Sequence, residues 1–462
     1  MIDKIESTLT RVEPETSKLR SVLLFLAVAA ATFFQKPAPA LMWDAAEYLR
    51  GSMALVSGRD IYAEGGLSFR GVWTPIIYSP AAAVNQILGR GGYGGGLYVV
   101  VLLQGALLVA AICVLLLPAV LRLWFPQNSM SQVVCVIVGY VVLRNFAPYS
   151  VMDVWAIALI LLAICLLARQ GMAALLFAGL ALGVSANLRP AYILTALAIT
   201  VVTVAYLRWR GLMILGGLVL AQIPQVAVNW FVNEKVTPFP VDLASLSRQT
   251  STFASYVVRY DTIAYRPWAQ GGQFFCDPAM VRVAMDKLPS NYAELITLFG
   301  TNPLLTARFL FQRLGAVLLW PVTVPYFEWI PILNLLFGVV IVLITILGIS
   351  GLVLTRTESS KLSLPRVATL VVIAGVLVNL VLVHAESRYA IPLVLIGIVG
   401  IAGLVGQGAN RGIRRTNIRG GLPAVIAVLT FAVLLSVSGY EGLQHADSCP
   451  TAESLKNAQT EP

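Results

Sequence analysis

The sequence predicts an all-α polytopic membrane protein with about eleven transmembrane helices and two larger outer loops. Of its 462 residues, 58% are hydrophobic and only 12% are charged, whereas soluble domains carry about 25% charged residues. The mean hydropathy is +0.82, and apolar runs recur along the chain at lengths approaching the ~20 residues that cross a bilayer. The net charge of +10 is therefore interpreted through membrane topology and not as a nucleic-acid surface.

Eleven apolar runs are the candidate spans. The first lacks a small-residue cleavage site and is followed by further spans, so it is interpreted as a retained anchor and not as a signal peptide. The runs lie near residues 21–35, 97–121, 131–143, 149–168, 172–188, 191–207, 211–231, 329–354, 367–383, 390–406 and 421–438.

Basic residues in the short connections predict the orientation, because Lys and Arg concentrate in cytoplasmic loops. The protein is expected in a bacterial cytoplasmic (inner) membrane. An inside N-terminus and an outside C-terminus place nearly all of these basic residues on the cytoplasmic side of that membrane. The run 310–327 contains Pro321 and Pro325, which interrupt helices, and is interpreted as a membrane-surface or re-entrant segment. The cytoplasmic connections then receive Arg122, Arg169, Arg208, Arg210, Arg356, Lys361, Arg366, Arg411, Arg414, Arg415 and Arg419.

This topology divides the chain into three parts. Residues 1–231 form a seven-span module with a first outer loop at 36–96, residues 232–328 form a large outer loop or cap, and residues 329–462 form a four-span module with an outer tail. In the first loop we expect a short helix around 43–57, a turn at 57–60 and a second short amphipathic helix. The Gly-rich stretch at 89–96 has no Walker pattern and is interpreted as a flexible lead-in to the second span.

The five cysteines fit this arrangement. Cys113, Cys135 and Cys165 fall inside spans, where they are expected to pack as small apolar residues. Cys276 and Cys449 lie in the large outer loop and the outer tail. They are expected either to pair in an oxidising compartment or to remain two free thiols.

Charged residues recur where spans end on the predicted outer side. Asp44 and Glu47 are three residues apart, a spacing that places both on one face of a helix. An acid at the depth of Asp153 is costly unless it has a partner or lines a cavity. The residues that share this face are Asp44, Glu47, Asp153, Arg189, Glu386 and Arg388; polar turns between spans would account for any one of them alone.

Carboxylates and arginines at an outer membrane boundary suit sugar transfer from a lipid-linked phosphate. The leaving phosphate needs cationic stabilisation, which arginine provides through bidentate contacts. The acceptor hydroxyl loses its proton as it attacks the anomeric carbon, so one carboxylate acts as base. A single base opposite the leaving group predicts inversion. Two acids flanking a bond would also suit hydrolysis.

Four stretches carry a family resemblance: WDAAEYLRGSMALVSGRDIY, WTPIIYSPAAAV, ANLRPAYIL and HAESRYAIPL. Together they resemble the GT-C superfamily of integral membrane glycosyltransferases, in particular the bacterial mannosyl- and arabinosyltransferase branch that uses polyprenyl-phosphate sugars. The resemblance implies that Asp44 is the catalytic base or a metal ligand, that Asp153 is a second functional acid and that Arg388-Tyr389 reaches the active site. The first loop has a spaced Asp-x-x-Glu instead of adjacent acids, which disfavours a bound metal.

The expected roles follow from this comparison. Asp44 and Glu47 are the catalytic candidates, with helix capping as the alternative for both. Arg388, Arg189 and Tyr389 are expected to bind the donor phosphate, although a structural pair with Glu386 would explain Arg388 and snorkelling would explain Arg189. The expected substrate-binding residues are Asp153, Tyr48, Tyr78, Trp73, His384 and Glu386; the aromatic ones are equally typical of membrane-interface anchors.

The predicted partners are a polyprenyl-phosphate sugar, a glycan or glycolipid acceptor and membrane lipid, with no nucleic acid. No metal site is expected, with Asp44 and Asp153 as the weak alternative for a divalent Mg or Mn ion. A lipid-linked-sugar flippase or transporter is a rival class, but it should show repeat symmetry and charges near the bilayer midplane. An O-antigen ligase or polymerase would share the outer loop but would transfer a diphosphate-linked glycan.

Overall fold

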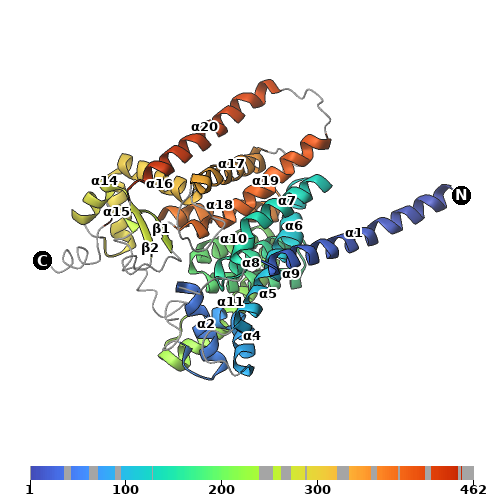
Figure 1. Cartoon of the computed structure of the whole chain (residues 1–462), viewed down its shortest axis with the longest axis horizontal. Helices are drawn as coiled ribbons and strands as arrows, with labels where there is room; N and C mark the ends of the chain where they lie inside the picture. The colour runs from blue at the N-terminus through green and yellow to red at the C-terminus, as the bar shows by residue number, and fades with distance from the viewer. Residues whose placement is uncertain are drawn as a thin grey trace.

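The chain folds into a helical bundle with a small capped end (Figure 1). The computed structural model describes residues 2–35, 43–61, 71–88, 95–126, 128–238, 253–261, 272–286, 289–319, 332–354, 362–382, 386–410, 418–445 and 449. The helices of its first half are α1 (Ile2–Phe33), α2 (Trp43–Val56), α4 (Trp73–Ile87), α5 (Gly95–Ala110), α6 (Leu117–Trp124), α7 (Ser129–Leu143), α8 (Met152–Leu167), α9 (Met172–Leu188), α10 (Ile193–Leu207) and α11 (Leu212–Asn233). Those of its second half are α14 (Pro278–Asp286), α15 (Tyr292–Thr301), α16 (Pro303–Leu319), α17 (Ile332–Leu354), α18 (Leu364–Leu382), α19 (Ile391–Asn410) and α20 (Ile418–Gly442).

Seven helical stretches in the described part of the chain are long and apolar enough to cross a membrane. The described residues of each of the eleven expected runs fall largely on helices, but the count of eleven spans is not reached. The helices α8 and α9 have 16 and 17 residues, and α10 and α11 fall within the single stretch Pro190–Val232. The chain is thus a multi-pass helical membrane protein with seven candidate spans.

Short basic turns gather at one end of the bundle, which we call the basic end. Arg210 Nη2 donates to the carbonyl oxygen of Gln170 at 2.9 Å, which joins the turn after α10 to the turn after α8. Arg366 Nε, at the start of α18, donates to the carbonyl of Leu123 near the end of α6 at 2.6 Å. Because α8, α10 and α6 all finish here, their opposite ends lie together at what we call the site end.

The first loop packs its two helices on the site end through buried amides. The backbone N–H of Val72 donates to Gln225 Oε1 at 2.8 Å and that of Trp73 to Asn187 Oδ1 at 3.2 Å. Asn187 Nδ2 donates to the same Gln225 oxygen at 3.1 Å. These bonds satisfy groups that burial would otherwise leave unpaired. One helix, α4, runs from Trp73 onward, so the Trp-Thr-Pro motif begins the expected second helix and does not precede it.

A small cap covers the site end. It consists of a two-stranded antiparallel hairpin, β1 (Tyr256–Asp261) and β2 (Gly272–Cys276), together with α14 and α15. These elements lie beside the C-terminal end of α20, on the side away from the N-terminus of α1 (Figure 1). Cys276 and Cys449 form a disulfide that ties β2 to the C-terminal segment, and the N–H of Cys276 donates to the carbonyl of His445 at 3.2 Å.

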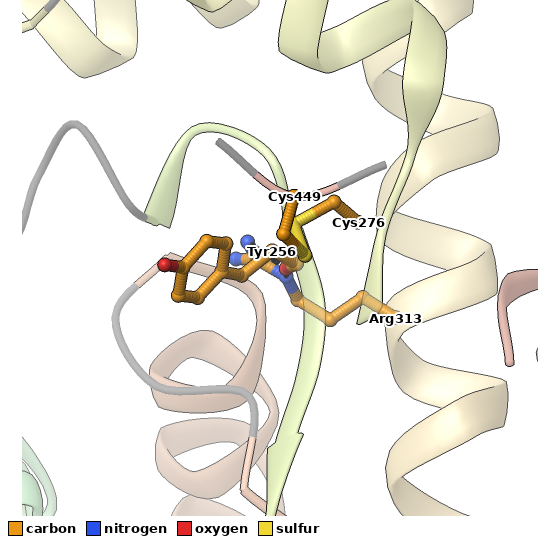
Figure 2. The surroundings of a disulfide bond; sticks show 4 residues. All are labelled: Tyr256, Cys276, Arg313 and Cys449. Atoms are coloured by element: carbon orange, nitrogen blue, oxygen red, sulfur yellow. Dashed lines mark hydrogen bonds between the residues drawn. A yellow bond between two sulfur atoms is a disulfide. The ribbon is translucent and has the colours of Figure 1, made fainter. Parts of the chain in front are cut away.

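Arg313 of α16 fastens this cap to the bundle. Its guanidinium is buried and donates to the carbonyls of Phe253 and Tyr256, and to that of Val381 at 2.7 Å. Figure 2 shows the side chain reaching from α16 to the backbone of Tyr256 beside the disulfide. The segment expected to lie on the membrane surface or to re-enter therefore begins as a helix whose second half is buried; residues 320–327 of that segment lie outside the described residues.

The helices α16 and α20 touch through their backbones. A Cβ atom on Gly315 would lie 2.2 Å from the carbonyl oxygen of Leu435, and one on Gly439 would lie 2.3 Å from the carbonyl carbon of Gly315. Any side chain at either position would force the helices apart. Small residues permit such close approach in membrane bundles, so the cap, α16 and α20 form one packed unit.

Reduction of the Cys276–Cys449 disulfide is expected to lower the stability of the cap by about 2–4 kcal/mol, because the bridge closes a long loop. The measurement is thermal unfolding of the purified protein in detergent with and without reductant. The Cys276→Ser/Cys449→Ser variant is the matched control: it should start at the lower midpoint and ignore reductant. An unchanged midpoint in fully reduced wild-type protein would contradict the expectation.

Candidate functional site

Four helix ends bring charged residues together at the site end. Asp44 lies in the first turn of α2 and Asp153 in the first turn of α8. Arg189 follows the last residue of α9 in an extended conformation, with φ −137° and ψ 100°; the proline after it disfavours a helical one. Arg388 lies in the 3₁₀ turn Ser387–Ala390 that leads into α19.

Hydrogen bonds between these segments set their distances. Ser150, just before α8, donates its hydroxyl to the carbonyl of Ala45 at 2.8 Å, which holds α2 against the start of α8. On the other side, an isolated parallel bridge joins Arg259 of β1 to Glu386. The cap strand therefore supports the backbone that carries Glu386 and Arg388.

The charged side chains form one connected cluster, which we call the ion cluster. Arg189 bonds Asp153 through Nη2, and its Nη1 lies 3.7 Å from Asp44 Oδ2. Arg388 Nη2 lies 2.9 Å from the same oxygen, and its Nε donates to Glu386 Oε2 at 2.7 Å. Asp44 thus bridges two arginines, and each arginine also has a second carboxylate of its own.

Burial makes this arrangement energetically demanding. The side chains of Asp153 and Arg189 are each 1% exposed and that of Asp44 is 12% exposed. Charges withdrawn from water persist only when they are paired and hydrogen-bonded. Two guanidinium groups face three carboxylates, which leaves one formal negative charge on the ion cluster.

Aromatic rings surround Arg189. Its guanidinium carbon lies 5.9 Å from the ring centroid of Tyr48 and 5.5 Å from that of Tyr389, distances typical of cation–π contacts. Tyr192 was not expected at the site. It is buried, and its hydroxyl interacts electrostatically with Asp153 and Arg189. Its position three residues after Arg189, across a proline, was the only signal in the sequence.

The other expected site residues are more dispersed. Glu47 is half-buried three residues after Asp44 on α2. Tyr78 is buried, with its hydroxyl 3.5 Å from the carbonyl of Val151. Trp73 donates its indole N–H to the carbonyl of Ala221 at 2.8 Å, so its ring anchors α4 to α11. His384 lies outside the described residues.

Several buried polar atoms of the ion cluster region have no hydrogen-bond partner among the described residues. They include Oδ1 of Asp153, Nε of Arg189 and the hydroxyl of Tyr192. Buried groups of this kind call for an explanation, because leaving them unpaired costs free energy. Within the same described part of the chain, no group of three or more His, Cys, Asp or Glu side chains is placed to hold a metal ion.

An apolar cavity of about 800 Å³ lies between α9, α10 and α11. Its wall includes Ala186 and Ile193, which flank Arg189 three and four residues away in the chain, and Trp230 at its far side. Gln222 is a polar member of the wall. Residues on either side of Arg189 in the chain therefore line a space suited to an apolar chain.

No family model, curated protein or solved structure matches the chain. The fold and the site define a multi-pass helical membrane protein with a buried ion cluster at one end of its bundle. The function must therefore be inferred from the chemistry of that cluster.

Proposed function

We propose that the protein is a membrane glycosyltransferase that moves a single sugar, with inversion, from a polyprenyl-phosphate donor to a glycan, glycolipid or other acceptor. The observation that carries the proposal is the position of Asp44: a carboxylate at 12% exposure, in contact with two arginines that come from distant helix ends. A base and two phosphate ligands are the groups that this reaction requires.

The chemistry balances with these residues alone. The acceptor oxygen attacks the anomeric carbon and gives its proton to a carboxylate oxygen of Asp44. The bond between the anomeric carbon and the phosphate oxygen breaks, and its electron pair stays on the polyprenyl phosphate. Arg189 and Arg388 stabilise the charge that develops on that phosphate through hydrogen bonds, which are strongest where water is excluded.

The apolar cavity supports a lipid-linked donor. A polyprenyl chain in the space between α9, α10 and α11 would place its phosphate near Arg189, since Ala186 and Ile193 line the cavity and flank that residue in the chain. The unpaired oxygens of Asp153 and Tyr192 add polar capacity beside the arginine. A soluble nucleotide-sugar donor has no apolar chain that such a cavity would bind.

The disulfide supports an outward-facing site. Disulfides persist in oxidising compartments outside the cytoplasm, and Cys276–Cys449 lies in the cap over the site end. Lys and Arg concentrate in cytoplasmic turns, and Arg210 and Arg366 lie at the opposite end of the bundle. Both observations favour a site on the outer face of a bacterial cytoplasmic membrane.

The test is sugar transfer by the purified protein in liposomes. Polyprenyl-phosphate donors with different radiolabelled sugars would be supplied together with membrane glycolipid acceptors, and the anomeric configuration of the product read by NMR. We expect transfer with inversion by the wild-type protein and transfer slowed by about 10²–10⁴-fold in Asp44→Asn at equal protein level. Movement of intact donor across the bilayer without transfer would replace the proposal by a flippase, and transfer only from diphosphate-linked glycans by a ligase.

A further inference from the structure

One oxygen of Asp44 takes the place that an anionic ligand would occupy between the two arginines. Oδ2 lies 2.9 Å from Nη2 of Arg388 and 3.7 Å from Nη1 of Arg189. Guanidinium groups that converge on one point from two elements are a phosphate-binding arrangement. In this structure the converging groups meet a carboxylate of the chain itself.

If Asp44 moved away, each arginine of the ion cluster would keep one carboxylate partner. Arg189 keeps its contact with Asp153, and Arg388 keeps Glu386 at 2.7 Å. Glu386 lies two residues from Arg388 in the same turn, so these two side chains are held together by the backbone. Asp44 comes from α2, in a different part of the chain, and its contact with Arg189 is the longest of the four. Asp44 is therefore the carboxylate that an anionic ligand could displace.

The exchange also conserves charge. A polyprenyl-phosphate sugar is a phosphodiester with one negative charge, the same as the ionised carboxylate it would displace. A swap between them leaves the formal charge beside the two arginines unchanged, which avoids the cost of adding an uncompensated charge to a buried site.

We infer that Asp44 is an internal substitute for the donor phosphate, and that donor binding displaces it from the arginines and so makes it available as the base. This inference rests on the proposed function and adds to it a fixed order of events. Without donor, Oδ2 of Asp44 is ion-paired with Arg388 and Arg189 and is held at the position of the phosphate, away from an acceptor hydroxyl. With donor bound, the same oxygen is free to face the acceptor.

The test measures phosphate binding in the absence of transfer. Farnesyl phosphate and, separately, inorganic phosphate would be titrated against the full-length protein in nanodiscs. Asp44→Asn and Asp44→Ala should bind farnesyl phosphate roughly tenfold more tightly than wild type, the scale of one charge-assisted hydrogen bond. Asp44→Glu, which keeps the carboxylate, should bind as weakly as wild type. If the two variants also bind inorganic phosphate about tenfold more tightly, the effect belongs to the phosphate group alone. If their affinity rises more for farnesyl phosphate than for inorganic phosphate, the lipid chain contributes as well. Both results support the inference.

The control is Glu441→Gln. Glu441 is exposed and pairs with Arg308 at 2.6 Å, so this variant also removes one negative charge but leaves Arg189 and Arg388 untouched. Binding by Asp44→Asn and Asp44→Ala that is equal to or weaker than wild type would overturn the inference, as would equal tightening in Glu441→Gln. If Asp44→Asn fails to fold, Asp44→Ala and Asp44→Glu give the same comparison. Normal sugar transfer by Asp44→Asn would instead contradict the assignment of Asp44 as the base, whatever the binding result.

Discussion

Replacing Arg189 by methionine is expected to destabilise the protein by about 3–5 kcal/mol, because it leaves the carboxylate of Asp153 buried without its partner. Asp153 is 1% exposed and lies in the first turn of α8. Asp44 would lose one of its two arginines in the same step. The measurement is equilibrium unfolding in mixed detergent, with the unfolding midpoint converted to a free-energy difference.

A double variant separates charge pairing from packing. Arg189→Met/Asp153→Leu replaces both charges by apolar groups, which is often nearly neutral for a buried pair. We expect it to be more stable than Arg189→Met alone, so that the two single losses do not add. Strict additivity of the two single losses would show that Asp153 and Arg189 contribute independently and would contradict the pairing in the ion cluster.

The second large effect is on rate. Asp44→Asn should lower kcat for sugar transfer by about 10²–10⁴-fold, the range associated with a lost general base. Asparagine has the shape of aspartate but accepts no proton, so the protein should keep its unfolding midpoint. The assay is initial rate of transfer at saturating donor and acceptor.

Glu47→Gln is the comparison for this loss. Glu47 lies on the same helix three residues away and is half-buried, so the variant removes a neighbouring carboxylate with little change in packing. We expect a much smaller reduction in kcat than in Asp44→Asn. Equal losses in both variants would mean that the two acids act together, and a larger loss in Glu47→Gln would move the base assignment to Glu47.

Much of the bundle could be predicted from hydrophobic runs and basic turns. Local composition determines which segments enter the lipid and which connections stay in water. The positions of α2, α8 and α19 could be read in the same way. The cross-contacts could not be predicted. The spacing of Asp153 and Arg189 in the sequence does not predict that they bond, because the contact depends on how α8 and α9 pack. The hydrogen bond from the indole of Trp73 to α11 likewise depends on how α4 and α11 pack.

The number of spans was predicted less well than their positions. The runs at 149–168 and 172–188 are helices of 16 and 17 residues, short for a bilayer of ordinary thickness. Tyr192 and Arg313 were missed because their contacts with Asp153 and with Phe253 and Val381 join segments that are distant in the sequence. Arg313 lies near the start of the apolar run 310–327, and its guanidinium joins Phe253, just before β1, to the end of α18.

The disulfide also has a consequence for biosynthesis. Cys276 pairs with a residue 173 positions later, so the hairpin leaves the ribosome long before its partner does. At 5–20 residues per second, that interval is about 10–35 s. During it α17 to α20, which hold the last four candidate spans, must enter the membrane, and we expect the hairpin to remain without its disulfide until Cys449 is made. The site would then be completed as the last event of maturation, after every span is in place, which delays activity until the whole chain has been made.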